Sequence, residues 1–103
     1  MKSMALATMK DLASKSTEVA NLLRELANEK RLMILCTLLD LKEASVAELA
    51  MRVEISQSAL SQHLARLREH DLVKFRRDGT TIFYRVSDSK IARLMKSLKS
   101  IYC

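Results

Sequence analysis

The chain has 103 residues, of which 49% are hydrophobic, while glycine and proline together contribute a single residue. This composition predicts one small, mainly helical domain spanning residues 1–103, with a flexible start at about residues 1–8. It excludes a disordered chain and an all-β sandwich, which needs many turns. Eighteen Lys and Arg residues against twelve Asp and Glu residues leave a formal net charge of +6. A small basic domain favours an anionic partner, and nucleic acid before a membrane surface.

The sequence contains no run of about 18 apolar residues that could cross a bilayer, and its start lacks the apolar stretch of a secretory signal. We therefore expect a cytoplasmic, nucleoid-associated protein without a membrane partner. In that compartment the two cysteines, Cys36 and Cys103, are expected to be thiols, metal ligands or a redox pair rather than a permanent disulfide.

The first half of the chain predicts three helices. Apolar residues recur every three or four positions from Met9 to Leu26, which is typical of an amphipathic helix. The segment EKRLMILCTLLD, residues 29–40, is apolar over most of its circumference and is predicted to be the buried core helix. Ser45 and Glu48 form the S-x-x-E pattern of a capping box, so a short third helix is expected over about residues 46–52.

The second half predicts a helix-turn-helix followed by a wing. Ser56 is a candidate N-cap for a helix from Gln57 to about His70, whose leucines form one narrow inward-facing stripe. A short capped helix, a tight turn and a helix with a polar free face make the helix-turn-helix arrangement. The period then changes to two, and Asp78-Gly79 within LVKFRRDGTTIFYRV marks the turn of a two-stranded hairpin, the wing.

A last helix is expected after the wing, capped by Ser87 or Asp88, with an apolar stripe from Ile91 to Tyr102. The first and last helices thus both carry apolar stripes that the compact DNA-reading unit is too small to bury. We therefore predict a homodimer built from these two helices. Twofold symmetry would place two recognition helices about 34 Å apart, matching an inverted-repeat operator in double-stranded DNA.

Polar groups on the predicted recognition helix and wing are the candidate DNA contacts. Hydroxyl and amide groups can pair with base edges in the major groove, which points to Ser58, Ser61 and Gln62. The candidates for phosphate contacts are Gln57, Arg66, Lys74, Arg76, Arg77 and Arg85. The Arg76-Arg77 pair is expected at the wing tip, reaching toward the minor groove. The competing interpretation is a solvated helix face and an ordinary charged hairpin.

An enzyme is not expected. The sequence has no Gly-rich phosphate loop, no pair of acids in a plausible cleft pattern and no nucleophile beside an orienting base. It implies no cofactor.

Four stretches resemble the ArsR/SmtB family of winged-helix bacterial repressors over roughly residues 18–103: ELANEKRLMILCTLL, SVAELA, ISQSALSQHLARLREHDLV and RRDGTTIFYRV. SQSALSQHL is the most specific piece. The cysteine in ILC and the one after IY at the chain's end are similar to those of the metal-independent dithiol branch, whose members respond to reactive sulfur species or oxidants. The resemblance implies a DNA-binding repressor or anti-silencer whose operator affinity changes when Cys36 and Cys103 become linked by a disulfide or a polysulfide.

Metal-sensing relatives carry a C-x-C motif on the helix that begins here at Val46, or acidic and histidine ligands on the last helix. The first region reads SVAELAMRV, without Cys or His, and the last helix has Lys90 where a ligand histidine would be expected. No metal site is therefore expected. Three alternatives stay open: a metal-responsive repressor that uses the same thiols, a constitutive DNA binder with structural cysteines, and a helical interaction module that binds no DNA and whose terminal apolar stripes dock a partner protein.

Overall fold

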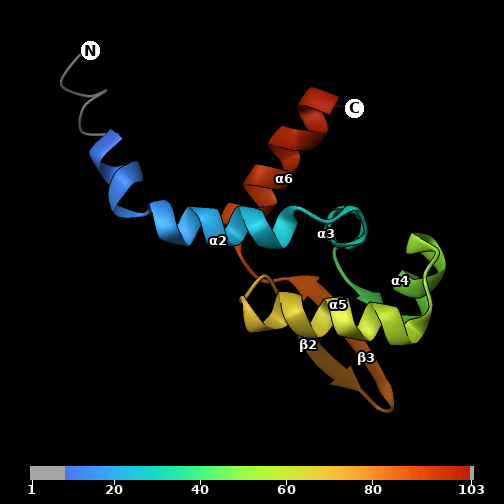
Figure 1. Ribbon diagram of the computed structural model, residues 1–103. Coiled ribbons are helices and arrows are strands. Elements are labelled where there is room, and N and C mark those ends of the chain that lie inside the picture. Colours follow the sequence, from blue (N-terminus) through green and yellow to red (C-terminus); the bar gives the residue numbers. More distant parts are fainter. Residues whose placement is uncertain (1–8, 103) are drawn as a thin grey trace.

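A computed structural model describes residues 9–102 and has the predicted winged-helix architecture, mainly α-helical with a small sheet (Figure 1). The elements in chain order are α2 (Ser16–Leu26), α3 (Glu29–Leu41), β1 (Ala44–Ser45), α4 (Val46–Val53), α5 (Gln57–Glu69), β2 (Val73–Asp78), β3 (Thr81–Val86) and α6 (Ser89–Tyr102). The start that was expected to be flexible, residues 1–8, and Cys103 lie outside the described residues. None of the described helices is both long and apolar enough to span a membrane.

The single helix predicted from Met9 to Leu26 is wrong in one respect, because the structure interrupts it at Lys15. The residues before Lys15 are helical, and α2 begins after it. The Ser14 hydroxyl donates a hydrogen bond to the Asp11 carbonyl oxygen at 2.8 Å. A serine side chain that bonds a carbonyl of its own turn competes with the helical ladder. The apolar period therefore continues across a break in the backbone.

Side-chain hydrogen bonds cap the N-termini of four of the described helices. Asn28 starts α3, and the predicted caps Ser45 and Ser56 start α4 and α5; each accepts a hydrogen bond from the backbone N–H three residues later, at 3.0, 3.2 and 3.1 Å. Of the two predicted caps for α6, Asp88 fills the role, since its carboxylate accepts from an N–H of the first turn at 2.7 Å. Ser87 instead donates to a backbone carbonyl oxygen before β2. These caps satisfy backbone donors that the helices leave unpaired.

The predicted hairpin is present, but the sheet has a third strand that was not predicted. The strand order is β1-β3-β2. Asp78 pairs with Thr81 across the two-residue turn, and Gly79 at the first turn position has a φ of 64°, a conformation that favours glycine. Ala44 of β1 pairs with Tyr84 of β3. A strand of two residues is too short to show a period, so only its tertiary pairing reveals it.

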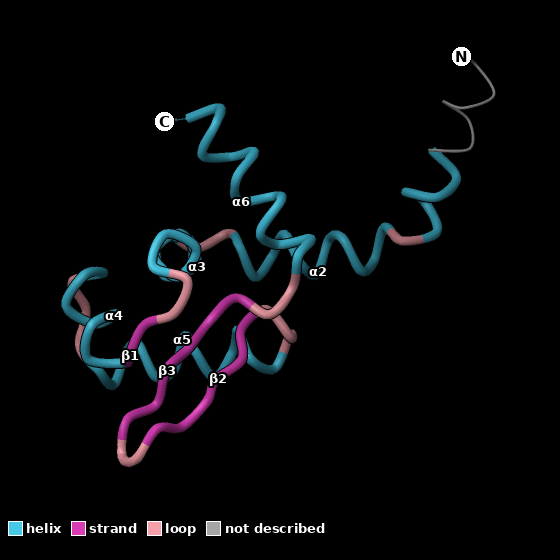
Figure 2. The backbone as a smooth tube through the Cα atoms, turned by 180° about the vertical axis from the view of Figure 1, so that it is seen from behind, coloured by secondary structure: helices cyan, strands magenta, loops and turns pink. Residues whose placement is uncertain are grey.

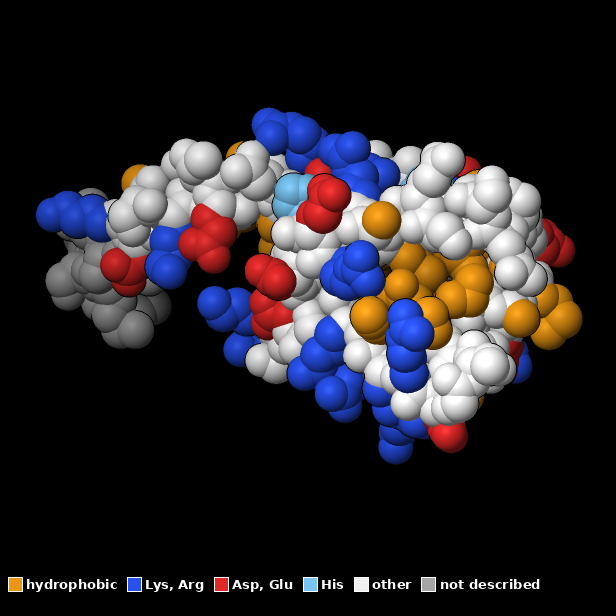
Figure 3. Space-filling model, turned by 90° about the horizontal axis from the view of Figure 1, so that it is seen from below, with side chains coloured by type: hydrophobic (Ala, Val, Ile, Leu, Met, Phe, Trp, Pro, Cys, Tyr) orange, Lys and Arg blue, Asp and Glu red, His pale blue; other side chains and the backbone are white. Residues whose placement is uncertain are grey.

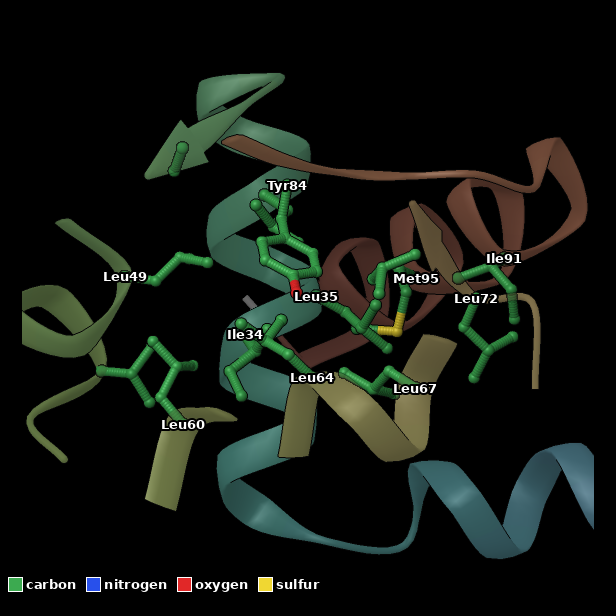
Figure 4. Close-up of a cluster of buried hydrophobic side chains, with 14 of the residues drawn as sticks. Ile34, Leu35, Leu49, Leu60, Leu64, Leu67, Leu72, Tyr84, Ile91 and Met95 are labelled. Atoms are coloured by element: carbon green, nitrogen blue, oxygen red, sulfur yellow. The ribbon is translucent and has the colours of Figure 1, made fainter. Parts of the chain in front are cut away.

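The hydrophobic core fills the space between α3, α5 and α6, with Tyr84 of β3 reaching in (Figure 4). Side chains that are at most 1% exposed include Ile34, Leu35, Leu38, Leu49, Leu60, Leu64, Leu67 and Ile91. The leucine stripe predicted for α5 is thereby confirmed. Each fully buried leucine contributes about 1.5–3 kcal/mol of transfer free energy, so the stripe docks α5 firmly on the core.

The two terminal helices project away from the wing. α2 extends sideways from the body and α6 rises on the side opposite the hairpin (Figures 1 and 2). Both carry large apolar side chains that stay exposed: Leu23 is 51%, Ile101 72% and Tyr102 81% exposed. The wing side of the molecule and the apolar terminal helices are therefore separate surfaces.

Candidate nucleic-acid interface

The turn between α4 and α5 forms the predicted helix-turn-helix. Glu54 ends α4 in the left-handed region, with φ 60° and ψ 50°, and its N–H bonds the Ala50 carbonyl oxygen. The next N–H, from Ile55, donates to the same oxygen at 3.1 Å. Ser56 then caps α5 at once. Because the turn is short and hydrogen-bonded, the orientation of α5 follows from the way α4 packs on the core.

The first two turns of α5 present polar side chains on the face opposite its leucines. All four residues predicted to contact DNA there are exposed: Gln57, Ser58, Ser61 and Gln62. Ser56 bonds a backbone N–H, whereas within residues 9–102 the side chains of these four make no hydrogen bond to the protein. Their donors and acceptors face solvent, as a surface that reads base edges requires.

Arg66, farther along α5, is bound to a buried carboxylate. Its Nε lies 2.6 Å from Oε2 and 3.0 Å from Oε1 of Glu25, and its Nη2 lies 2.9 Å from Oε1. Glu25 is only 2% exposed, while the Arg66 side chain is 52% exposed. The hydrogen-bonded Arg66 guanidinium holds the pKa of Glu25 below its usual value, against the opposing effect of burial. The residue predicted to contact a phosphate is thus already paired with a carboxylate of the protein, although half of its side chain is exposed.

Arg76 on the wing is also held by an acid. Its Nε lies 2.9 Å from Oε2 of Glu43, its Nη2 pairs with the other carboxylate oxygen, and its guanidinium lies 4.7 Å from the centre of the Phe83 ring. Arg76 pairs with Phe83 across the hairpin, three residues before the first turn position, Gly79. The pair ties β2 to the segment before β1. Arg76 therefore lies on the body of the wing rather than at its tip.

The other basic wing residues are exposed on two different faces. Lys74 and Arg85 pair across the strands and share a face with Arg76. Arg77 lies on the opposite face, paired with Ile82 and next to the turn. No described residue forms an ion pair with Lys74, Arg77 or Arg85. These three cations are available to an anionic partner.

The surface that carries the wing is rich in positive charge. Seen from that side, Lys and Arg side chains gather along one side of an apolar patch between the helical part and the hairpin (Figure 3). The hairpin contacts the recognition helix, where the Arg68 guanidinium lies 5.1 Å from the centre of the Phe75 ring. The recognition helix and the wing therefore adjoin and form one basic surface.

Of the two cysteines, Cys36 lies in the part of the chain that the structure describes. Cys36 is partly buried on α3 and packs against the core, and α3 in turn packs against α6. Asp40, one turn after Cys36, accepts a hydrogen bond from Lys99 of α6 at 2.9 Å. Cys103, the predicted partner, lies outside the described residues. Within the described part of the chain, no group of three or more His, Cys, Asp or Glu residues could hold a metal ion.

Two acids of this region, Glu25 and Glu43, were missed by the sequence analysis. Both bind arginines that were predicted to contact DNA. The helical period does not distinguish the buried Glu25 from the exposed Glu18 on the same helix. Glu25 is 41 residues from Arg66 in the sequence, and Glu43 is 33 residues from Arg76. Sequence spacing therefore carried no signal for either pair.

Comparisons with known proteins agree with this architecture. A family model described as "Bacterial regulatory protein, arsR family" matches residues 28–74. The transcriptional activator HlyU of Vibrio cholerae is 45% identical over 95 residues, which cover 92% of the chain and 87% of that protein. The biofilm growth-associated repressor of Xylella fastidiosa is 44% identical over 96 residues, covering 93% of the chain and 83% of that protein.

Solved structures give the same result. Reduced HlyU from Vibrio cholerae has a TM-score of 0.84 at 46% identity, covering 91% of the chain and 98% of its own. The transcriptional repressor BigR from Xylella fastidiosa has a TM-score of 0.86 at 43% identity, covering 92% and 96%. The predicted winged helix, the resemblance to this branch and the expectation of a regulator rather than an enzyme are confirmed. The chain belongs to the arsR family of bacterial regulatory proteins.

Proposed function

We propose that the protein binds an inverted-repeat operator as a homodimer, and that linking Cys36 to Cys103 lowers its operator affinity. Membership of the family makes the chain a DNA-binding transcriptional regulator. Its relatives include proteins named an activator and a repressor. Bound to a promoter, the reduced dimer acts as a repressor or, where it displaces a silencing protein, as an anti-silencer. Thiol oxidation would release it from the DNA.

The exposed polar face of α5 and the basic wing support the DNA-binding part of the proposal. Ser58, Ser61 and Gln62 are the residues assigned to base edges, since nothing in the described chain engages their side chains. The groups assigned to phosphates are Gln57, Lys74, Arg77 and Arg85. Arg66 and Arg76, predicted as further phosphate contacts, are each held by a carboxylate.

The exposed apolar side chains of the terminal helices support the homodimer. Leu23 on α2 and Ile101 and Tyr102 on α6 are each more than half exposed. Burying such side chains against a second copy removes apolar surface from water at roughly 25 cal/mol per Å². A twofold axis through this surface leaves both wings and both recognition helices on the opposite side, where one duplex can meet them.

The observation that carries the sensing part is the position of Cys36. It lies on α3, which packs against α6, the helix that leads to Cys103, and the Asp40–Lys99 ion pair joins the same two helices one turn away. Oxidation would remove two protons and two electrons from the two thiols. Peroxide would take them up and become two water molecules, leaving a disulfide. An inorganic polysulfide would take them up by releasing part of its sulfur as sulfide, and the sulfur it transfers would remain between the cysteines. A direct disulfide needs Cα atoms about 5.5 Å apart, and a polysulfide spans more.

Intact-protein mass spectrometry tests the sensing part. The reduced protein is treated separately with an inorganic polysulfide and with peroxide, and DNA binding is followed on the same samples. We expect a loss of two hydrogens, with one or two added sulfurs after polysulfide, together with loss of DNA binding. Cys36→Ser is expected to bind DNA and to ignore both reagents. A Cys36→Ser protein that still releases DNA on oxidation would refute the mechanism.

A matched variant controls for other oxidisable groups. Met33 precedes Cys36 on α3 and is 46% exposed, so peroxide can convert it to a sulfoxide. Met33→Leu should lose the oxygen gained at this residue and keep the response, while the exposed Met9 and Met51 can still be oxidised. Unchanged mass and binding in the wild type would identify a constitutive DNA binder with structural cysteines. Stoichiometric Zn(II) uptake abolished by thiol blocking would favour the metal-responsive alternative.

A further inference from the structure

The recognition helix is joined to α2 by a cluster of polar side chains around the buried carboxylate of Glu25. We call Glu25, Arg31, Arg66 and His70 the Glu25 cluster. Glu25 lies in the last turn of α2 and is 2% exposed, and Arg66 and His70 come from the end of α5. The cluster thus joins segments 41 residues apart in the sequence.

The contacts in the Glu25 cluster fix both position and orientation. The Arg66 guanidinium grips the Glu25 carboxylate with Nε at 2.6 Å from Oε2 and Nη2 at 2.9 Å from Oε1. His70 Nε2 lies 3.3 Å from Oε1. Arg31, in the first turn of α3, donates from Nε to the Glu25 backbone carbonyl oxygen at 2.6 Å. A two-pronged arginine–carboxylate pair restrains rotation as well as distance, which a single ammonium cannot do.

The geometry of Arg66 suits pairing with Glu25 rather than the phosphate contact that was predicted for it from the sequence. A phosphate-binding arginine needs a guanidinium that is free to turn toward the duplex. The Arg66 nitrogens Nε and Nη2 point instead at a carboxylate that has almost no access to water. Both partners of the pair are charged and one is buried, so leaving the pair intact is favoured over exchanging Glu25 for a hydrated phosphate.

We propose that Glu25, acting through Arg66, is a positioning residue that fixes the recognition helix relative to α2 and thereby sets the half-site spacing the protein accepts. The inference rests on the proposed DNA-binding homodimer. Because α2 belongs to the proposed dimer surface, the orientation of α5 on α2 determines the separation of the two recognition helices. Loosening the Glu25–Arg66 pair would let the separation of the two recognition helices vary. The affinity of the dimer for a duplex that carries both half-sites would then fall.

The test compares two variants with a matched control on another helix. Glu25→Gln removes the buried charge, and Arg66→Lys keeps the positive charge but loses the bidentate contact with the carboxylate. Arg52→Lys makes the same exchange on α4, where the arginine pairs at 3.3 Å with Glu48, an acid whose side chain is itself exposed. Each protein is titrated, at several salt concentrations, against a duplex selected from randomised DNA by the wild type and against the same duplex with one base pair inserted between the half-sites.

Glu25→Gln and Arg66→Lys are each expected to bind the selected duplex about 2- to 30-fold more weakly. Both should discriminate less than wild type against the inserted base pair, while the dependence of affinity on salt stays unchanged. The double variant should bind the selected duplex no more weakly than the weaker-binding single variant, because the two substitutions remove the same interaction. Arg52→Lys should keep the wild-type spacing preference, because its ion pair with Glu48 is exposed and lies within α4.

Several outcomes would overturn the inference. One is wild-type spacing discrimination in folded Glu25→Gln and Arg66→Lys proteins, which would leave the pair a purely structural one. A third variant, Arg66→Gln, removes the positive charge; a reduced salt dependence in this variant, together with unchanged binding by Glu25→Gln, would make Arg66 a phosphate contact. If Glu25→Gln does not fold, Arg66→Lys carries the test alone. Failure of the wild type to bind any selected duplex would instead overturn the proposed function, and the inference with it.

Discussion

Replacing Arg77 by glutamine is expected to affect DNA binding differently from the same replacement at its neighbour Arg76. Both are exposed arginines on β2. Arg76 is held by Glu43 and lies over the Phe83 ring, whereas Arg77 has no ion-pair partner among the described residues. Only Arg77 is therefore counted among the residues assigned to phosphates.

The expected magnitude follows from counterion release. Each phosphate contact contributes about −0.9 to the slope of log affinity against log salt concentration, so Arg77→Gln should make the slope of a homodimer less steep by about 1.8. When salt is raised from 50 to 200 mM, the fall in affinity of Arg77→Gln should therefore be smaller than that of the wild type by a factor of about 12. Arg76→Gln should keep a slope near that of the wild type and lower affinity at every salt concentration, because the wing loses its tie to Glu43.

Fluorescence anisotropy with a labelled duplex selected by the wild type measures both slopes. Arg93→Gln serves as the charge-matched control, because Arg93 is exposed on α6, away from the wing. Circular dichroism at the assay temperature establishes that each variant is folded. Equal slopes for wild type and Arg77→Gln, or equal reductions for Arg76→Gln and Arg77→Gln, would contradict the distinction drawn from the Glu43 pair.

Stability measurements test the remaining features. Leu64→Ala, at a site 1% exposed, should lower the free energy of unfolding by about 2–5 kcal/mol in urea titrations, and a smaller loss would mean that the core collapses around the cavity. Ser56→Ala should cost about 0.5–2 kcal/mol through the lost α5 cap, against no cost for Ser58→Ala on the exposed face. The pKa of Glu25 is lowered mainly by the Arg66 hydrogen bond, so its contribution to stability is present above its usual pKa of 4.5 and is lost as pH falls through the folded value. Wild type should therefore lose more stability than Glu25→Gln in acid, and parallel curves would refute this. Burial, and then the charge of Arg31, lowers the pKa of His63, so wild type should lose stability between pH 7 and 5 relative to His63→Gln; a wild type that gains stability there would show the opposite shift.

Much of the fold was predictable because its signals are local. The S-x-x-E pattern at Ser45, the cap at Ser56, the leucine stripe of α5 and the Asp78-Gly79 turn each depend on residues within a few positions of one another. Short-range hydrogen bonds and apolar periods determine such features before any tertiary contact forms. The break at Lys15 is local too, but the apolar period runs across it unchanged and so concealed it.

The role of individual charges depended on contacts that no local pattern contains. The sequence alone placed Gln57, Ser58, Ser61 and Gln62 on the free face of a recognition helix, because a helical period assigns faces. It did not show that Arg66 and Arg76 are bound to Glu25 and Glu43, or that two residues of β1 complete the sheet. Those pairings join segments dozens of residues apart, and packing brings their partners together only when the core forms. The sequence by itself determined the DNA-reading architecture, and only the tertiary structure decided which arginines of that surface are engaged by the protein's own carboxylates.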